Sequence, residues 1–396
     1  MTELAVLARL SNDADHPVER LTCHPRLPFA VGTATEGRNV RIFDCGEGQL
    51  REIASLEVEP GSAPWGDDAP PAVVWHPEEP LLVVADGESL LRWTPDGPAD
   101  PVRVPAAAGY EVLAFSPDGR HLWASPSADD DWEVSDVLDP GTGAVTGRTR
   151  GWDTGVGTHP SGALVATLAS DQGATLCLFA RPDDGAMRMQ RHTLILDCDG
   201  YGTPLFSPDG RHFAIRGNAY VESVEVFAFP SLHRVLRTTL QEPANGDEWS
   251  RHNLAFGAAP GVLWIGTPTG TLLELDVAAR SDVEHDLQLG SPLTALATTA
   301  NGELLLALDS GEVVLVPVHH DPAPAAGFAA EDVTAFLAAT TELSEDGNPK
   351  QEPVLTDGTR TWTHDDLATV AEASPADPTW LQIQANINQV RGTRTP

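Results

Sequence analysis

A seven-residue sequence occurs twice in this chain, at residues 115–121 and again at residues 206–212. Both copies read FSPDGRH, and a short apolar run typical of a β-strand follows each of them. Proline presets φ at the second position of a tight turn, aspartate hydrogen-bonds to its own backbone, and glycine accepts positive φ. Because the same turn signature returns along one chain, the sequence predicts a repeat architecture.

Weaker copies of this turn surround the two identical ones. Neighbouring copies are separated by 40 to 52 residues, about 46 on average, which suits one four-stranded propeller blade and is too long for most helical repeats. The apolar runs are short, rich in Val, Leu and Phe, and bounded by Gly, Pro and Asp, as strands are. The aligned turn positions are Pro25, Pro77, Pro117, Pro160, Pro208, Ala258 and Ala300.

The seventh copy supplies three strand-like runs and then enters a Pro/Ala segment at residue 321, so its fourth strand is missing. At the other end of the chain, residues 4–10 form a strand-like run that belongs to no copy. A ring of blades must hide its first and last edges. We therefore expect an all-β fold, a seven-bladed β-propeller over residues 1–320 whose N-terminal strand closes the last blade.

Residues 3–320 resemble the WD-repeat (WD40-like) family of seven-bladed propellers in period, strand pattern, FSPDG turns and N-terminal closure. The Gly-His pair that precedes the first strand in that family is absent here. Its terminal Trp-Asp pair has counterparts only in Phe43-Asp44 and Leu275-Asp276. The resemblance implies the propeller fold, with degenerate repeats.

The charge of the chain restricts its partners. With 24 Lys+Arg against 58 Asp+Glu, the formal net charge is −34. Phosphate backbones and anionic membrane surfaces repel such a chain, so we expect neither nucleic acid nor membrane as a partner, and a protein with a basic patch is favoured. The sequence also shows no signal peptide and no apolar run of about 18 residues. The four cysteines form no CxxC motif and are interpreted as free thiols, which favours a cytoplasmic location.

Histidines suggest two metal sites, and both have a simpler interpretation. His24, His76 and His159 occupy equivalent turn positions in different blades, which lie far apart around a ring, so we interpret them as turn residues. His319, His320 and Asp321 stand together at the end of the propeller and could bind a metal weakly, although an exposed linker is favoured. We expect no metal and no cofactor.

Aromatic residues gather in the loops of one predicted face. In most connections between blades an aromatic precedes the first strand, and two more stand between second and third strands. Trp and Tyr anchor protein interfaces because they bury a large area and keep a polar tip. The alternative is that they plug the ring entrance or pack between blades. The candidate partner-binding set, with its rim, is Trp65, Tyr110, Trp132, Trp152, Tyr201, Tyr220, Trp249, Arg251, Asp129, Asp130 and Asp131.

The three aspartates of this set belong to an acidic loop of the third blade. Calcium needs alternating oxygen ligands around a glycine turn, and this run lacks that spacing. A solvated loop and a docking point for basic residues of a partner are the two interpretations that remain.

No catalytic motif appears: the sequence has no GxSxG, no HExxH and no phosphate-binding glycine loop. Propeller enzymes assemble their sites from several blades, however, and such a set cannot be recognised in one sequence. We expect a non-catalytic protein–protein interaction scaffold rather than an enzyme. The alternatives are a propeller enzyme with a catalytic or metal site at the central channel, and a propeller that binds a small molecule or a glycan.

The composition changes after residue 320, so we expect a C-terminal extension over residues 321–396. It begins with a Pro/Ala linker, and Val333, Phe336 and Leu337 then follow helical spacing. Residues 354–363 resemble a short hairpin around Asp357-Gly358, and Thr363 with Asp366 forms a capping-box-like start of a helix through residue 373. Residues 380–390 suggest a last amphipathic stretch. A segment of this size buries little core alone, so it either packs on the propeller or is ordered by a partner.

Overall fold

The computed structural model describes most of the chain. The described residues are 4–11, 15–59, 70–87, 89–103, 109–125, 134–152, 154–171, 174–198, 200, 202–217, 221–241, 248–318, 327–343, 353–374 and 377–393. The chain divides into two compact units. The first unit comprises residues 1–152 and 241–324, and the second comprises residues 153–240 and 325–396.

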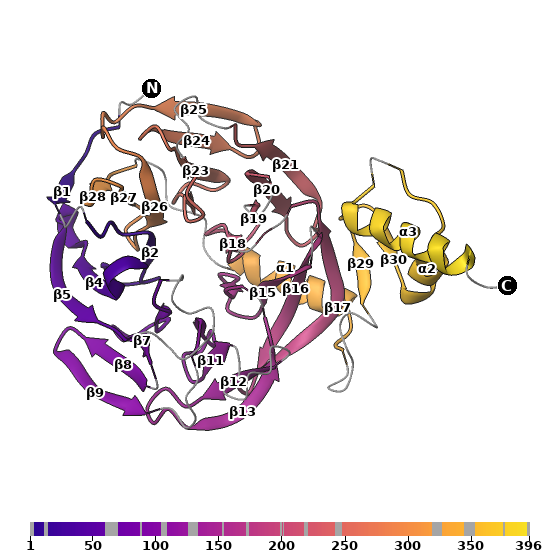
Figure 1. Ribbon diagram of the computed structural model, residues 1–396, viewed down its shortest axis with the longest axis horizontal. Coiled ribbons are helices and arrows are strands. Elements are labelled where there is room, and N and C mark those ends of the chain that lie inside the picture. Colours follow the sequence, from indigo (N-terminus) through magenta and orange to yellow (C-terminus); the bar gives the residue numbers. More distant parts are fainter. Residues whose placement is uncertain are drawn as a thin grey trace. The chain divides into compact units, whose positions relative to one another are not determined.

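Seven sheets, one for each predicted blade, confirm the seven-bladed β-propeller (Figure 1). The first unit holds blades one, two, three, six and seven. Blade one consists of β2 (Arg20–Cys23), β3 (Phe29–Thr33), β4 (Asn39–Asp44) and β5 (Arg51–Glu57). Blade two consists of β6 (Val73–Trp75), β7 (Leu82–Asp86), β8 (Ser89–Thr94) and β9 (Gly97–Arg103). Blade three consists of β10 (Val112–Phe115), β11 (Leu122–Ser125), β12 (Val134–Leu138) and β13 (Val145–Arg150).

The remaining blades follow the same order. Blade six consists of β22 (Leu254–Phe256), β23 (Val262–Gly266), β24 (Leu272–Asp276) and β25 (Ser281–His285). Blade seven consists of β26 (Leu293–Thr298), β27 (Leu304–Leu308), β28 (Glu312–Val316) and β1 (Ala8–Ser11). In the second unit, blade four contains β14 (Gly157–Thr158), β15 (Val165–Asp171), β16 (Ala174–Asp183) and β17 (Ala186–Leu196). Blade five contains β18 (Leu205–Phe206), β19 (His212–Gly217), β20 (Ser223–Ala228) and β21 (Arg234–Thr239).

The N-terminal strand closes blade seven, as the sequence predicted. β1 pairs antiparallel with β28, in a register that runs from Ala8 opposite Leu315 to Ser11 opposite Glu312. The strand at the start of the chain thus supplies the fourth strand that the last repeat lacks.

The two FSPDGRH copies form the same turn. In the first copy, the Ser116 hydroxyl donates to Asp118 Oδ1 at 2.6 Å, the same Oδ1 accepts from the Arg120 amide at 3.2 Å, and Gly119 has φ +73°. The second copy repeats these bonds, with Ser207 donating to Asp209 at 2.6 Å. The repeated sequence therefore encodes turn chemistry.

The histidines of the His-Pro turns connect neighbouring blades. His24 Nε2 lies 2.8 Å from the carbonyl oxygen of Glu79, in the corresponding turn of blade two. His159 Nε2 lies 3.1 Å from the carbonyl oxygen of Gly210, which links blade four to blade five in the same way. Burial lowers the pKa of both histidines, so their neutral forms are favoured. The interpretation as turn residues is confirmed. His319, His320 and Asp321 lie outside the described residues.

Five short elements follow the propeller. They are α1 (Gly327–Ala339), β29 (Val354–Thr356), β30 (Thr361–Trp362), α2 (His364–Thr369) and α3 (Thr379–Thr393). The hairpin around Asp357-Gly358 and the capping box of Thr363 and Asp366 form as predicted. α2 ends at Thr369, four residues before the predicted end. The propeller boundary at residue 320 stays a prediction, because the second compact unit joins these elements to blades four and five.

Candidate functional site

Most of the predicted partner-binding residues lie outside the described part of the chain. These are Trp65, Asp129, Asp130, Asp131, Trp132, Tyr201 and Tyr220. Their assignment, and the choice between a solvated loop and a docking point for the aspartates, stay predictions. The four members that the structure describes are Tyr110, Trp152, Trp249 and Arg251.

Tyr110 and Trp152 are buried. Tyr110 is 5% exposed and belongs to a hydrophobic cluster formed by residues of blades two and three. Its hydroxyl donates to Oδ2 of the buried Asp136 at 3.0 Å, and burial, followed by the Asp136 carboxylate, raises its pKa. Trp152 is 3% exposed. For these two side chains, the alternative that the aromatics pack inside the fold describes the structure, and little of their surface is left for a partner.

Trp249 and Arg251 stand just before β22 and are more accessible. Trp249 is half-buried, and its indole N–H donates to the carbonyl oxygen of Gln241 at 2.9 Å. Arg251 is exposed. Among the described members of the predicted partner-binding set, Trp249 and Arg251 are the two that are not buried.

Sequence reasoning missed the most unusual part of the fold, which is blade four. Its two outer strands, β16 and β17, have 10 and 11 residues, longer than any other strand of the propeller. The chain after the propeller returns to this hairpin and covers the edge of β17. The sheet of blade four therefore has six strands, in the order β14-β15-β16-β17-β29-β30.

The edge of β17 is covered in two stretches of opposite direction. Along its first half, the Arg191 amide donates to the Thr341 carbonyl and the Leu343 amide donates to the Met189 carbonyl, both at 2.8 Å. Along its second half, β29 pairs in parallel, from His192 opposite Val354 to Leu194 opposite Thr356. The polar edge of the outermost strand is thus satisfied by the chain's own extension.

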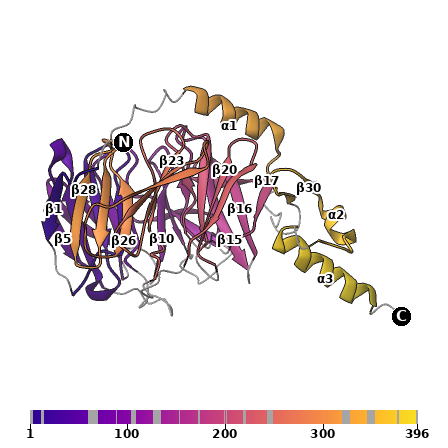
Figure 2. The ribbon, with the colours of Figure 1, turned by 90° about the horizontal axis from the view of Figure 1, so that it is seen from above.

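Helix α1 adds an apolar anchor. Val333 and Phe336 are 1% and 5% exposed, and both belong to the core cluster of blades four and five. The Phe336 ring lies 5.3 Å from the rings of Phe179 and of Phe229, measured between centroids. Figure 2 shows α1 beyond one end of the strands of these blades, whereas β30, α2 and α3 lie beside β17. The apolar face predicted for this helix is confirmed, and packing on the propeller is the outcome for this segment.

Residues 353–393 form what we call the C-terminal module, which consists of β29, β30, α2 and α3. Its interior contains Leu355, Leu367, Leu381 and Ala385, all at most 7% exposed. The Asn388 side-chain amide also donates to the carbonyl oxygens of Leu367 and Val370, at 2.7 and 2.8 Å, which ties α3 to the end of α2.

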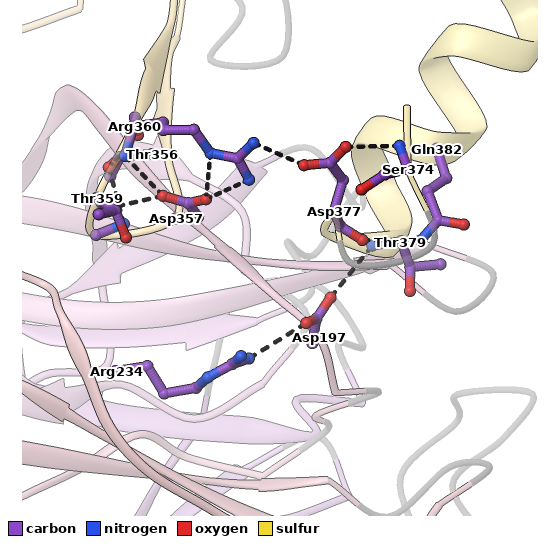
Figure 3. A network of polar contacts seen from close by, with 11 residues as sticks. Asp197, Arg234, Thr356, Asp357, Thr359, Arg360, Ser374, Asp377, Thr379 and Gln382 are labelled. Atoms are coloured by element: carbon purple, nitrogen blue, oxygen red, sulfur yellow. Dashed lines mark hydrogen bonds and ion pairs between the residues drawn. The ribbon is translucent and has the colours of Figure 1, made fainter. Parts of the chain in front are cut away.

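An arginine connects the hairpin of the module to the segment before α3 (Figure 3). Arg360 donates through Nε and Nη2 to Asp357, at 3.0 and 2.8 Å, and through Nη1 to Asp377 at 2.6 Å. The Ser374 amide and then Arg360 lower the pKa of Asp377, so its carboxylate form is favoured. Arg360 also stacks over Trp362, with its Cζ 4.9 Å from the ring centroid.

Asp197, just after β17, fastens α3 to the blades. Its Oδ1 accepts the amide of Thr379, the first residue of α3, at 3.1 Å, and its Oδ2 accepts from Arg234 of blade five at 3.2 Å (Figure 3). A carboxylate at a helix N-terminus is stabilised by the helix dipole. Arg234 also reaches the fully buried Glu225 at 3.0 Å, and Arg237 lies 3.3 Å from Asp197 and 3.4 Å from Glu225, so two guanidinium groups face the two carboxylates.

The outer face of α3 is apolar and open to solvent. Ile383, Ile387 and Val390 are 40%, 39% and 52% exposed, whereas Leu381 and Ala385 on the inner face are each 3% exposed. We call the three outward residues the α3 stripe. Among the described residues of the second unit, this stripe is the clearest candidate contact surface.

Within the described residues, no group of three or more His, Cys, Asp or Glu side chains could hold a metal ion. No helix in that part of the chain is long and apolar enough to cross a membrane.

Comparison with known proteins supports the fold. No known family profile matches the sequence, and no curated protein matches it. Among solved structures, the chain is similar to the Kuenenia stuttgartiensis hydrazine synthase, with a TM-score of 0.56 and 15% sequence identity. The match covers 78% of this chain and 97% of that one. At this identity the likeness shows the propeller fold alone.

The same likeness corrects one expectation. The sequence led us to expect that the chain is not an enzyme, because it carries no recognisable catalytic motif. That expectation is contradicted by a similar structure, that of an enzyme, hydrazine synthase. The absence of a local motif is a poor basis for that expectation, because a propeller can assemble a site from side chains of several blades.

Proposed function

We propose that this chain is a protein-interaction scaffold in which blades four and five hold the C-terminal module as a rigid arm for a partner. One observation carries the proposal. The module is attached by the pairing of β29 with β17 and by Asp197, Phe336 anchors the preceding helix α1, and the α3 stripe on the outer face of the module stays exposed.

The attachments have the strength that such an arm needs. Burial of a phenylalanine side chain contributes about 1.5–3 kcal/mol, and each backbone hydrogen bond contributes about 0.5–1.5 kcal/mol net. Phe336, the Thr341 and Leu343 backbone bonds and the pairing of β29 contribute together to holding the extension on the blades. An arm fixed in this way loses little conformational entropy when a partner binds, which favours affinity.

The loop surface predicted from the sequence belongs to the same proposal as a second contact region. Exposed Arg251 and half-buried Trp249 support it, because arginine and tryptophan are frequent at interfaces. Membership of the WD-repeat family is also part of the proposal, supported by the repeat period and by the closure through β1. So is a cytoplasmic location, since no disulfide joins the four cysteines, all of which the structure describes.

Photo-crosslinking at single positions tests where a partner binds. A photoreactive residue is placed at Ile387 on α3, at Arg251 on the loop surface, or at Ile53, an exposed apolar residue of β5 that serves as the matched control. Each full-length variant is illuminated in extract of the native host, and covalent adducts are identified by mass spectrometry.

We expect the Ile387 variant to capture a discrete protein that the Ile53 variant does not capture. Capture at Arg251 alone would move the contact to the predicted loop surface. An identical set of adducts at all three positions, or none at Ile387 and Arg251, would refute the scaffold function. Binding and catalysis are compatible in a propeller, and the proposal concerns binding alone.

A further inference from the structure

The α3 stripe is a narrow apolar line on one side of a helix. With 3.6 residues per turn, Ile383, Ile387 and Val390 lie within about 60° of one another around the helix axis. Leu381 and Ala385, which face the interior of the module, lie on the opposite side. The inner face therefore packs in the module, whereas the three β-branched residues of the outer line are 39–52% exposed.

Polar residues flank the stripe, and one of them, the exposed Arg391, is charged. Among the residues of α3, from Thr379 to Thr393, the sole charged one is Arg391, although the chain has 58 acidic residues in 396. The Gln384 side-chain amide donates a hydrogen bond to Asn388 Oδ1, one turn further along the helix, at 3.1 Å. An apolar line with a single charged residue beside it favours contact with another apolar line.

Charge selects the kind of partner. The chain carries a net charge of −34, and within the module the exposed Asp365, Asp366 and Glu372 lie on or just after α2, the helix that packs against α3. A cationic partner is attracted over a long range by this field and an anionic one is repelled. The apolar line and the acidic surroundings together fit an amphipathic helix whose polar face is rich in lysine or arginine.

A second copy of this chain fits less well. Two copies would bring net charges of −34 together. A stable dimer through α3 alone would also need more area: a helix of 15 residues is about 22 Å long, and at a width of about 10 Å its contact face covers a few hundred Å², below the roughly 800 Å² per partner of a stable interface. An anionic membrane is disfavoured by the same charge, and interfacial helices have polar faces rich in Lys and Arg, which α3 lacks.

We infer that the α3 stripe is the docking site of a cationic amphipathic helix of a partner protein. This inference rests on the proposed function and names the partner class for its arm. Because the contact area is small, the complex is transient, and electrostatic attraction supplies much of the association rate.

Binding of two synthetic peptides to the full-length protein tests the inference. Both peptides are amphipathic helices with the same leucine heptad positions, and their other positions are lysine in one and glutamate in the other. Binding is followed by fluorescence anisotropy of the labelled peptide. The stripe variant carries Ile383→Gln, Ile387→Gln and Val390→Gln, changes that favour the helix because glutamine has a higher helix propensity than isoleucine or valine. The control variant carries Ile53→Gln, Val145→Gln and Val283→Gln, three equally exposed apolar residues of other strands.

We expect the lysine peptide to bind the wild-type and control proteins equally and the stripe variant at least about tenfold more weakly. We also expect the glutamate peptide to bind at least about tenfold more weakly than the lysine peptide, with a difference that shrinks as salt is added. The inference fails if the stripe variant binds the lysine peptide as well as the control does, if both peptides bind alike, or if neither binds below about 1 mM.

Two further measurements test whether the stripe binds one of the two alternative partners, a second copy of the chain or a membrane. Self-association of the wild-type protein that disappears in the stripe variant would identify a second copy, and binding to phosphatidylserine vesicles that disappears in it would identify a membrane. Either result overturns the inference. If the peptides fail while Ile387 still crosslinks to a host protein, the partner class is wrong and the scaffold function stands. Failure of both experiments removes both proposals.

Discussion

Replacement of Phe336 by alanine tests how the extension is held. Phe336 is 5% exposed, and its ring packs 5.3 Å from Phe179 and from Phe229. Removal of a buried phenylalanine side chain costs about 3–5 kcal/mol, and each aromatic pair contributes about 0.5–1.5 kcal/mol beyond its area. We expect about 3 kcal/mol for Phe336→Ala. The cost has an upper limit, because α1 detaches once the loss exceeds the free energy that keeps it docked.

Amide hydrogen exchange measures the loss in docking free energy at the segment that α1 holds against β17. The Arg191 and Leu343 amides are bonded between β17 and the segment after α1, so they exchange when that segment opens. A loss of about 3 kcal/mol corresponds to exchange that is faster by about 100-fold at these amides. Glu331→Ala, on the exposed side of the same helix, is the control and should leave their exchange unchanged. If exchange in Phe336→Ala rises less than about threefold, the aromatic anchor does not hold the extension, and our account of the attachment is refuted.

Two other predictions concern the repeat turns. Gly119 has φ +73°, and a Cβ there would lie 2.1 Å from His76 Nε2, whereas Gly261 has φ +71° and open space around it. We expect Gly119→Ala to lower the free energy of unfolding by about 2–4 kcal/mol and Gly261→Ala by about 1 kcal/mol. The additional cost at Gly119 should disappear in a His76→Ala background. Equal costs of the two substitutions in urea unfolding would contradict the clash with His76. The second prediction is that stability falls as the pH drops from 7 to 5, because burial holds the pKa of His159 below 6.5 in the folded state and the unfolded state binds the proton first. His159→Gln should make this fall shallower, and an unchanged pH profile of the unfolding midpoint would show that His159 is not responsible.

The propeller could be predicted because its signals are local and repeated. The FSPDG turns, the strand-like runs and the spare N-terminal strand each need only neighbouring residues or a count of copies. The same is true of the capping box at Thr363 and of the apolar spacing of Val333 and Phe336. Each of these features depends on turn chemistry or helical periodicity, which short-range sequence expresses directly.

The candidate site could not be predicted in the same way. Tyr110 was assigned to a partner surface because an amphipathic aromatic suits an interface, but the same property suits a buried site with one polar contact, which Asp136 provides. The parallel pairing of β29 with β17 joins residues about 160 positions apart through three residue pairs. Pairing at such a distance leaves no periodic pattern in either segment, so only the fold reveals it.

The composition of β17 nevertheless carries a signal for its covered edge. The outer strands of blades one, five and six read REIASLE, RVLRTT and SDVEH, and charged, exposed residues recur along them, as is usual for an edge that must not pair with another chain. β17 ends instead with the sequence TLIL at residues 193–196, and all four of these residues are buried. A strand buried on both faces at the perimeter of a blade must have something outside it. The apolar end of β17 therefore predicts the docked extension. By the same reasoning, any propeller blade whose outermost strand is apolar on both faces should have a further segment packed against that strand.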